Sequence, residues 1–226
     1  MRSFFLNLYN LYYKHKLFFP KKTYSCWGED LIAENFFKNR EGKFYVDVGC
    51  YHPLFWNNTY LLYKKQWRGI NIDINPVSIK LFKFARKDDY NFNLAVTKKK
   101  IKKIKFFYRR KINVLNTTNK EFAKKNFPNG YSTSVSNCST LNNIISKTKF
   151  KNKQIDFLNI DVEGGELDVL RSLNFKKYKP KLICIEIHHN NQKSLKKNPI
   201  YKFLKRKKYK KKWSREYSFI FFKNFD

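Results

Sequence analysis

The sequence lacks a hydrophobic run long enough to cross a membrane, and it has little proline or glycine. None of its apolar stretches reaches about 18 residues, which excludes a transmembrane helix. The 226 residues include only 6 Pro and 7 Gly, so a collagen-like or linker-dominated chain is excluded as well. Because 42% of the residues are hydrophobic and 19% are aromatic, the composition is that of a folded chain rather than a disordered one.

Cysteines are few, and none of them forms a metal-binding pattern. The four cysteines are Cys26, Cys50, Cys138 and Cys184. No pair has CxxC spacing, so we predict neither a zinc site nor a disulfide framework. We expect reduced thiols in a cytoplasmic protein.

Acidic residues are scarce: 17 Asp and Glu face 49 Lys and Arg, which gives a formal charge of +32. Such a charge suggests nucleic-acid binding. However, only nine basic residues are Arg, the residue favoured for bidentate phosphate recognition. Lys, Asn, Ile, Phe and Tyr, all abundant here, have codons rich in A and T, so a biased genome accounts for the composition. We therefore expect no specific nucleic acid partner, only non-specific polyanion binding at low salt.

Residues 1–22 form an aromatic and basic leader. Asn7 and Asn10 interrupt its apolar residues and no small-residue cleavage site follows, so it is not a signal peptide. Helical spacing connects Phe4, Phe5, Leu8, Leu11 and Tyr12. Such a helix either packs on the domain or lies on an anionic membrane surface, at the inner face of a membrane. We predict an extension at 1–23 and a single domain at 24–226.

Beyond the leader, short apolar runs alternate with segments of helical periodicity. Strands are predicted at Lys43–Val48, Gly69–Ile72, Tyr90–Val96, Lys105–Tyr108, Ile155–Ile160, Leu182–Ile187 and Ser218–Phe222. Helices are predicted from Ser25 to Phe37, Asn57 to Lys65, Pro76 to Arg86, Ser139 to Ser146, Glu166 to Leu173 and Pro199 to Lys207. This alternation predicts an α/β fold with a mostly parallel central sheet and helices on both faces. The rest of the segment 98–152 is polar and gives no clear element.

Acidic and polar residues gather where the predicted strands end, at the sheet edge where open α/β sheets bind ligands. Asp73 ends the second strand, 24 residues after Gly49, and a carboxylate there can accept both hydroxyls of a ribose. The first loop, Gly49-Cys50-Tyr51-His52-Pro53, has one glycine instead of the GxGxxG that a pyrophosphate requires. An adenosine ligand without a pyrophosphate is therefore expected, and S-adenosylmethionine is one.

These motifs resemble the FkbM family of S-adenosylmethionine-dependent methyltransferases. The resemblance covers roughly residues 24–222, and its most specific parts are VDVGCYHPLFWNNTYLLYKKQWRGINID and IDFLNIDVEGGELDVL. The loop after Gly49 follows the His-Pro branch of the family. Cys26 and Trp27 stand where the family more often has Gln and Tyr. The resemblance implies a Rossmann-like class I methyltransferase sheet in which the last strand runs antiparallel.

The resemblance also implies roles at the sheet edge. Asp47 and Gly49 would line the methionine end of the cofactor, Asp73 would bind the ribose, and Asn93 and Ala95 would flank the adenine. Asn58 and Thr59 would hold the cofactor carboxylate at a helix start. Glu29 would close over the cofactor. For Asp47, Asn58, Thr59 and Glu29, a purely structural role as a cap or surface group stays open. The same holds for Asp73 as a helix cap before Pro76, and for Asn93 and Ala95 as an ordinary strand end.

Four residues are candidates for the catalytic base of a hydroxyl acceptor: Asp161, Glu163, His188 and His52. Asp161 would also contact the cofactor. The carboxylates suit Mg²⁺, but the second acidic group that such a site uses is not apparent, so no metal ligands are predicted. No (N/D)PP(Y/F) sequence occurs, and this favours oxygen over an exocyclic nitrogen as the methyl acceptor.

The sequence predicts a methyltransferase that uses S-adenosylmethionine to methylate a hydroxyl on a sugar, a glycan or a small metabolite. Two alternatives stay open. One is an RNA-directed methyltransferase or RNA-binding protein, with its groove formed by the basic and aromatic stretch 201–213. The other is a non-catalytic partner that retains the fold. The acceptor and the oligomeric state are not encoded in any motif.

Overall fold

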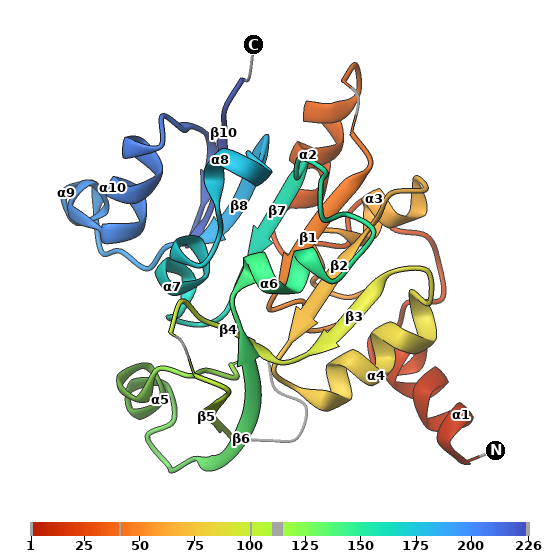
Figure 1. The fold of residues 1–226 in the computed structure, drawn as a ribbon. Coiled ribbons are helices and arrows are strands. Elements are labelled where there is room, and N and C mark those ends of the chain that lie inside the picture. Colours follow the sequence, from red (N-terminus) through yellow and green to blue (C-terminus); the bar gives the residue numbers. More distant parts are fainter. Residues whose placement is uncertain (1, 41, 100, 110–114, 225–226) are drawn as a thin grey trace.

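The computed structural model describes residues 2–40, 42–99, 101–109 and 115–224. Part of the segment 98–152, the first residue of the predicted extension and the last two residues of the predicted domain lie outside these ranges. A twisted sheet of seven strands runs through the middle of the molecule (Figure 1). In order across the sheet, the strands are β3 (Tyr90–Asn93), β2 (Arg68–Asp73), β1 (Phe44–Val48), β7 (Phe157–Ile160), β8 (Leu182–Glu186), β10 (Ser218–Phe222) and β9 (Lys210–Arg215).

The five strands from β3 to β8 are mutually parallel, and β10 is antiparallel to both of its neighbours. The predicted mostly parallel sheet is thus confirmed, and so is the antiparallel last strand. Since parallel strands all end at the same edge, the ends of β1, β2, β7 and β8 meet there.

Helices cover both faces of the sheet, as predicted. Their bounds are α1 (Arg2–Leu8), the π-helical η1 (Tyr9–Tyr13), α2 (Glu29–Phe37), α3 (Tyr60–Lys64), α4 (Pro76–Ala85), α5 (Lys120–Asn126), α6 (Leu141–Ser146), α7 (Glu166–Arg171), α8 (Phe175–Tyr178), α9 (Gln192–Lys197) and α10 (Pro199–Arg206). The helices α6 to α10 pack on one face through a large apolar cluster. The opposite face carries α2 and α3, which pack on Tyr45, Phe157 and Cys184.

Strand periodicity explains this two-sided packing. Successive side chains of a strand point to opposite faces, so Val46 and Val48 join the cluster under α6 and α7, whereas Tyr45 joins the cluster under α2. Every residue of β1 is buried. Burial on both faces is the reason that β1 appears in the sequence as a nearly continuous apolar run.

The segment between β3 and β7 forms a small lobe beside the main sheet. Its three strands, β4 (Ala95–Val96), β6 (Ser132–Ser139) and β5 (Lys103–Tyr108), form a second sheet, and α5 packs against it through Ala123 and Phe127. The predicted strand Tyr90–Val96 is therefore wrong as one element. It ends at Asn93, because the chain turns at Leu94 and Ala95 pairs with Cys138 in the small sheet.

Two predicted helix starts are also wrong. The helix predicted from Ser25 begins at Glu29, after Gly28 in a left-handed conformation. Ser25 instead donates a hydrogen bond to the Asp30 carboxylate. The helix predicted from Asn57 begins at Tyr60, because the Asn57 amide turns back to donate to Asp47 and to the Cys50 carbonyl.

Several elements had no sequence prediction, namely β6, α5, α8, α9 and β9. Strand β9 is the clearest case, since it is mostly exposed and rich in lysine. Pairing with β10 holds it at the edge of the sheet.

The leader lies against the domain at one side only. Leu11 and Leu17 are buried in a cluster with Leu54 and with Leu81 of α4. The aromatic residues on the other side of the leader are exposed. No helix in the described part of the chain is long and apolar enough to cross a membrane.

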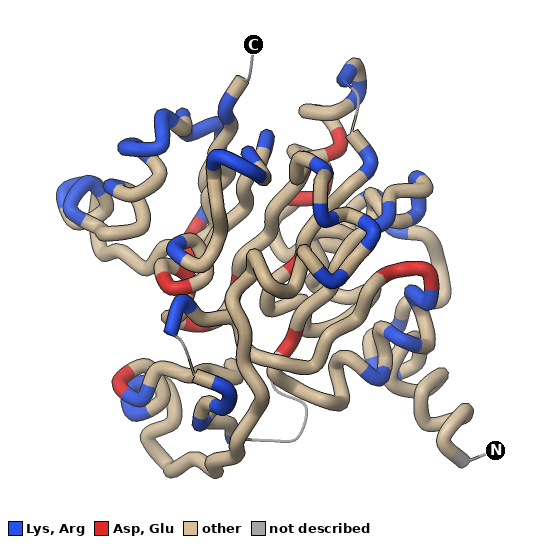
Figure 2. Tube along the Cα trace, in the orientation of Figure 1, with Lys and Arg blue, Asp and Glu red and all other residues tan. Residues whose placement is uncertain are grey.

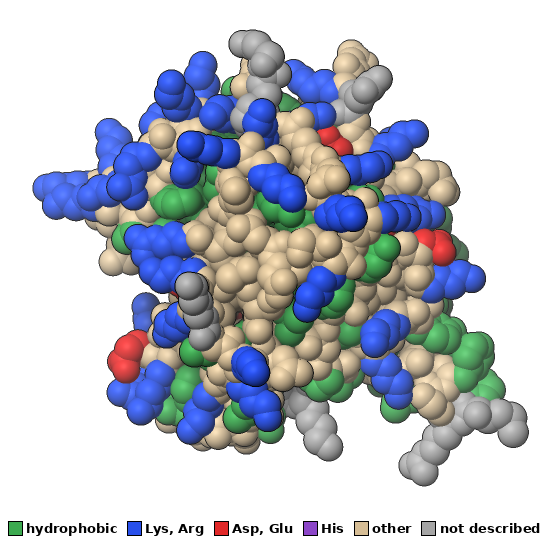
Figure 3. Space-filling view, viewed as in Figure 1, with side chains coloured by type: hydrophobic (Ala, Val, Ile, Leu, Met, Phe, Trp, Pro, Cys, Tyr) green, Lys and Arg blue, Asp and Glu red, His purple; other side chains and the backbone are tan. Residues whose placement is uncertain are grey.

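Charge is distributed unevenly between the surface and the interior. Figure 2 shows Lys and Arg around the periphery of the fold, while many of the acidic residues lie toward its middle. On the face shown in Figure 3, basic side chains are spread over most elements instead of lining one groove.

Candidate active site

The floor of a polar cavity at the carboxyl edge is set by strand register. Asp47 of β1 lies beside Asn159 of β7, which lies beside Cys184 of β8. These three residues project to the same face and line a cavity of about 460 Å³. Asn159 Nδ2 donates to Asp47 Oδ1 at 2.8 Å, so the floor is held together by its own polar groups.

A second, smaller cavity lies beside it, at the ends of β1 and β2. Asp73, Ile74 and Ala95 are among its lining residues. The two cavities share Gly49, Tyr51 and Asp161, so they are neighbours at one site. We call them the ribose-side cavity, after the ligand group that the sequence predicts for Asp73, and the acidic cavity, which contains Asp47.

Asp73 is positioned by the backbone around it. Its Oδ2 accepts from the Tyr51 backbone N–H at 2.8 Å, and its Oδ1 accepts from that of Asn75 at 2.7 Å. A carboxylate has about four acceptor positions, so two remain for a ligand. Burial raises the pKa of Asp73 to about 6. The cap of α4 is Asn75 rather than Asp73, since the Asn75 side chain accepts from Val77.

Gly49 is required by the protein itself. It has φ +80°, and a Cβ added there would lie 1.6 Å from the carbonyl oxygen of Asp161. The close neighbour is thus the residue that follows β7, and the expected contact of Gly49 with the methionine end of a cofactor stays a prediction. The effect on the site is indirect: glycine lets the first loop and the residues after β7 meet between the two cavities.

Asp47 is the centre of a buried network. It is inaccessible to solvent, and it accepts from Thr59 Oγ1 at 2.8 Å and from Asn57 Nδ2 at 3.2 Å. Arg86, also fully buried, donates to Thr59 Oγ1 at 2.8 Å and to Asn57 Oδ1 at 2.6 Å. Burial raises the pKa of Asp47 even though these groups oppose the shift. Thr59 is absorbed by the network and lines neither cavity, so the structure does not place it at a cofactor carboxylate.

The other predicted cofactor residues are distributed over three cavities. Asn58 and Glu29 line the acidic cavity; Asn58 donates to Asn159 Oδ1, and Glu29 accepts from the Trp27 backbone N–H. Ala95 lines the ribose-side cavity. Asn93 lines an adjoining cavity of about 530 Å³ under the small lobe, where its amide donates to the backbone carbonyls of Asp73 and Ile74.

Four carboxylates lie close together at the acidic cavity, and all of them except Glu166 line it. Asp161, Glu163, Glu166 and Glu186 come from the ends of β7 and β8 and the start of α7. Burial, followed by repulsion from Glu186, raises the pKa of Glu163 to about 9. Repulsion from Glu186 and Glu163 raises the pKa of Asp161 as well, although this residue is exposed. The Glu163 carboxyl therefore holds a proton at neutral pH unless a cation lies beside it.

The two predicted catalytic histidines lie in different environments. Glu186 and His188 form an ion pair with 3.3 Å between Oε2 and Nε2, and the hydrogen bond to Glu186 raises the pKa of His188. His52 is 2% exposed and lines neither cavity. Its Nδ1 accepts from the backbone N–H groups of Leu54 and Phe55, so its Nε2 carries the proton and donates to the Asn10 carbonyl.

The structure therefore corrects the expectation that His52 faces the reaction. Both of its nitrogens are occupied, and burial lowers its pKa to about 4. Its role is to tie the leader to the loop after β1.

Sequence reasoning missed several residues of the acidic cavity. Glu186, Glu216 and Tyr217 line it, and so do the half-exposed rings of Trp27 and Trp56. Glu186 lies in the predicted strand Leu182–Ile187, and Trp27 stands where the family more often has Tyr, so the position of both residues gave a signal. Glu216 and Tyr217 lie in the turn between β9 and β10, and no motif marks them.

The strand order, the antiparallel β10 and the paired cavities at the carboxyl edge define a class I methyltransferase fold. A comparison with protein families agrees: the methyltransferase FkbM domain matches residues 47–211, well over half of the chain. The chain belongs to the FkbM methyltransferase family, and it is a methyltransferase. Comparisons with curated proteins and with solved structures found no match.

Proposed function

We propose that the protein is an S-adenosylmethionine-dependent O-methyltransferase that methylates a hydroxyl of a sugar, a glycan or a similar small metabolite. One observation carries the proposal: two cavities meet at Gly49, Tyr51 and Asp161, one beside the Asp73 carboxylate and the other lined by acids and aromatic rings. A donor and an acceptor bound in adjoining cavities would react where these cavities join.

The residues present fit the donor. Asp73 keeps free acceptor positions for the ribose hydroxyls and already lies against the ribose-side cavity. The acids at the junction suit a ligand with a cationic sulfonium and ammonium. The donor would supply an electrophilic methyl group, and its C–S electron pair would stay on sulfur as a thioether when an acceptor oxygen takes that methyl.

The chain must then remove the proton of the acceptor hydroxyl. Asp161 lines both cavities, so its carboxylate lies where donor and acceptor would meet. Its raised pKa makes it a stronger base than an ordinary carboxylate. Asp161 would therefore accept the proton of the acceptor hydroxyl, and the acceptor oxygen would keep the electron pair that forms the new C–O bond.

The lining of the acidic cavity suits a carbohydrate acceptor. Trp27, Trp56 and Tyr217 each expose between 39% and 49% of their surface, and all three line it. Their rings offer apolar faces to the C–H groups of a sugar, while carboxylates accept from its hydroxyls. Among the residues described, no Lys or Arg lines either cavity, and this argues against a phosphate bound inside them.

The first test is thermal unfolding with S-adenosylhomocysteine in about 300 mM salt, which suppresses polyanion effects. At 100 times its dissociation constant the ligand should add about 2.7 kcal/mol of stability, a shift of several degrees. The Asp73→Asn variant should lose most of the shift, and Asp88→Asn, at an exposed acid after α4, should keep it. A folded wild-type protein that shows no shift would overturn the proposed cofactor.

The second test concerns the base and the acceptor. Asp161→Asn should retain S-adenosylhomocysteine binding and lose about 10²-fold or more in transfer of labelled methyl to a panel of neutral and nucleotide-linked sugars. An ether product that resists mild alkali supports O-methylation. Methylation of amines alone in the panel would contradict it.

A further inference from the structure

The structure brings together three side chains that could bind a metal ion, a group that the sequence did not reveal. One oxygen each of Glu163 and Glu186 and one ring nitrogen of His188 lie within 4.8 Å of one another. Glu163 follows β7, whereas Glu186 ends β8 and His188 follows it. Parallel pairing of β7 with β8 places these strand ends side by side.

The Glu163 side chain is the independent observation. It is only 6% exposed, yet no hydrogen bond reaches its carboxylate from any residue within the described ranges. A buried carboxylate without a partner is costly, so such groups are normally paired or bound to a cation. Glu186 and Glu166 both repel it, and a ring nitrogen of His188 lies within 4.8 Å of one of its oxygens.

We propose that Glu163, Glu186 and His188 bind a divalent metal ion at the rim of the acidic cavity. Two carboxylate oxygens and one imidazole nitrogen suit Mn²⁺ or Zn²⁺ better than Mg²⁺, which prefers oxygen ligands alone. Three ligands leave coordination positions for an acceptor oxygen. The proposal differs from the sequence-based prediction of no metal ligands.

The role of the metal rests on the proposed function, whereas its binding does not. An acceptor hydroxyl on the ion would lose its proton to Asp161 more readily, because the ion lowers the pKa of a bound O–H. The oxygen keeps its electron pair for the bond to the methyl carbon. No oxidant or reductant is involved.

The test is a titration of the full chain with Mn²⁺, followed by the loss of the paramagnetic signal of the free ion. Wild type should bind one ion per chain. Glu163→Gln and His188→Ala should weaken binding about tenfold or more, while Glu121→Gln, at an exposed acid on α5, should not. His188 is 44% exposed, so its variant tests the site even if the buried variant unfolds.

Two results would overturn the metal site: wild type that binds no Mn²⁺ below about 1 mM, or variants that bind as wild type does. Thermal shift with S-adenosylhomocysteine in the presence of EDTA separates this failure from that of the proposed function. Cofactor binding without Mn²⁺ binding rejects the metal alone. Mn²⁺ binding without cofactor binding rejects the donor and keeps the metal.

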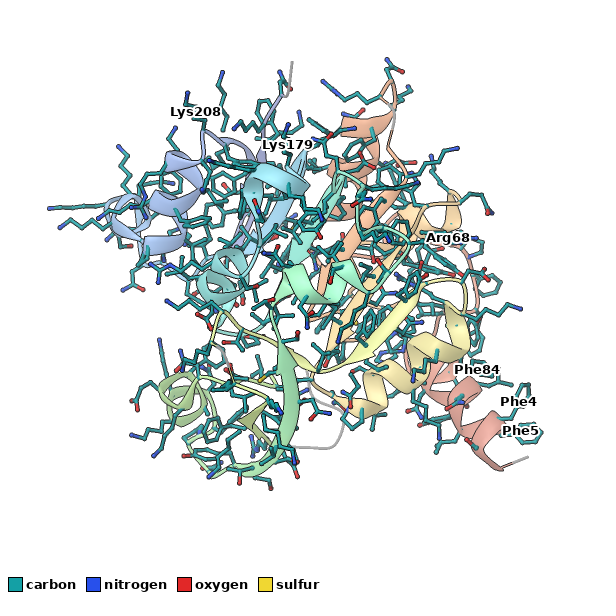
Figure 4. All side chains as sticks on the ribbon, in the orientation of Figure 1. Phe4, Phe5, Arg68, Phe84, Lys179 and Lys208 are labelled. Carbon is teal, nitrogen blue, oxygen red and sulfur yellow. The ribbon has the colours of Figure 1, made fainter. Side chains whose placement is uncertain are left out.

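A second, unrelated observation concerns the leader. Its buried residues, Leu11 and Leu17, fix it to α4 and to the loop after β1. On its other side, seven large apolar residues each expose 50% or more of their surface: Phe4, Phe5, Leu6, Tyr9, Tyr13, Phe18 and Phe19. Phe84 of α4 joins them, with its ring centroid 5.7 Å from that of Phe4. These eight residues form the leader patch, and Figure 4 labels Phe4, Phe5 and Phe84 together at one end of the molecule.

The charge around the leader patch is of one sign. The exposed lysines beside it are Lys14, Lys16, Lys21 and Lys22 in the leader and Lys80 and Lys83 on α4. No acidic residue occurs before Glu29. Apolar rings flanked by lysines are complementary to a bilayer surface with anionic headgroups. A second copy of the chain would bring another charge of +32 against the first, which opposes self-association through this face.

We infer that the leader patch binds an anionic membrane surface. The rings would enter the boundary between headgroups and acyl chains, and the lysines would stay among the headgroups. An RNA partner explains the lysines alone. Phe4 and Phe5 pack edge to face at 81°, and Leu6 has no ring to stack on a base.

The test is co-sedimentation of the full chain with vesicles of phosphatidylcholine, with or without about 30% phosphatidylglycerol, in about 150 mM salt. Wild type should bind the anionic vesicles, and the triple variant Phe4→Ser, Phe5→Ser, Phe19→Ser should not. Two double variants with equal net charge give the matched control. Lys16→Glu with Lys21→Glu should weaken binding about tenfold, whereas Lys179→Glu with Lys208→Glu, at the opposite end in Figure 4, should have little effect.

The inference would be overturned if wild type bound neutral vesicles as tightly as anionic ones. It would also be overturned if the two double variants weakened binding to the same extent. An unchanged affinity of the triple serine variant, or RNA that binds through the same three phenylalanines more tightly than the vesicles do, would overturn it as well. Self-association that the serine variant abolishes would identify a second copy as the occupant instead. Leu11 and Leu17 are unchanged in all variants, so the leader keeps its packing on the domain.

Discussion

Glu163 determines how the stability of the free protein depends on pH. Its pKa in the fold is about 9, above the ordinary 4.5. The folded state therefore binds more protons than the unfolded state in this interval, so stability falls as the pH rises from about 4.5 toward 9. Asp73, with a pKa of about 6, adds a smaller loss between about 4 and 6.

The substitution Glu163→Gln should remove the loss of stability that Glu163 causes as the pH rises. In EDTA, the variant and wild type should differ little at low pH, and the variant should be more stable at pH 9 by on the order of 3 kcal/mol. Urea unfolding at several pH values measures the difference. Glu121→Gln, at an exposed site, serves as the control and should follow wild type throughout. A variant that is less stable than wild type at pH 9 would show that the Glu163 carboxylate has a stabilising partner.

Arg86 is the buried basic residue on which the first loop depends. Besides Thr59 and Asn57, it donates to the Pro53 carbonyl, and its guanidinium lies 4.9 Å from the centre of the Phe82 ring. Arg86→Lys keeps the charge but loses the planar fork that makes several bonds at once, so it should cost about 2–4 kcal/mol.

Arg68→Lys is the matched control for that substitution, because Arg68 also contacts backbone carbonyls and a tyrosine ring but is partly exposed. It should cost less than about 1 kcal/mol. Equal losses in urea unfolding would mean that the buried network contributes nothing particular to the fold.

At the residue scale, the sequence could predict groups whose role follows from strand position. Asp73, Asp161 and Glu163 end or follow buried strands, and the fold places all three at the carboxyl edge. Thr59 and His52 were misassigned because their partners, Arg86 and the Asn10 carbonyl, lie 27 and 42 residues away along the chain. Nothing local in the sequence signals such a pairing.

At the scale of elements, the loop after β1 depends on Gly49. Gly49→Ala adds a Cβ at φ +80° and 1.6 Å from the Asp161 carbonyl oxygen, whereas Gly130→Ala adds one at φ +92° with nothing within 4 Å. Gly130→Ala should therefore cost about 1 kcal/mol, the backbone penalty alone. Gly49→Ala should cost about 3 kcal/mol or more and should abolish the S-adenosylhomocysteine shift.

Urea unfolding compares the two glycine variants, and thermal shift reports the ligand. If both variants lost the same stability, the contact between the first loop and β7 would have to relax without cost. Retained cofactor binding in Gly49→Ala would show that the junction between the cavities tolerates such a change.

The sequence predicted the elements in which buried apolar residues recur in a regular pattern along the chain. Strands β1, β7 and β8 are apolar because both of their faces are covered, and α10 begins at a Pro in its first turn, after an Asn cap. Strand β9 and the small lobe have no such pattern. The sequence KKKWSR of β9 is held by backbone pairing with β10, and β6 is mostly exposed, so their hydrogen bonds leave little trace in residue type.

At the scale of the whole molecule, basic charge covers the surface without converging on the site. The stretch 201–213 belongs to α10 and the edge strand β9, and none of its residues lines either cavity. RNA binding should therefore be weak at about 300 mM salt and steeply salt-dependent. S-adenosylhomocysteine should not compete with it.

Fluorescence anisotropy of a labelled RNA across a salt series, with and without S-adenosylhomocysteine, checks this prediction. Tight binding that persists in high salt, or that the ligand displaces, would favour an RNA-directed enzyme. It would also require the lysines to reach the acidic cavity in a conformation different from this one.

The acids lining the two cavities give the interior a potential opposite to that of the exterior. Among the acidic residues within the described ranges, eight line them: Glu29, Asp47, Asp73, Asp161, Glu163, Asp168, Glu186 and Glu216. An acceptor with a neutral or cationic head and an anionic tail would approach with a fixed polarity, because the surface attracts its tail while the cavity repels it. The molecule would thus orient its substrate electrostatically before contact, and a hydroxyl distant from any phosphate would enter first.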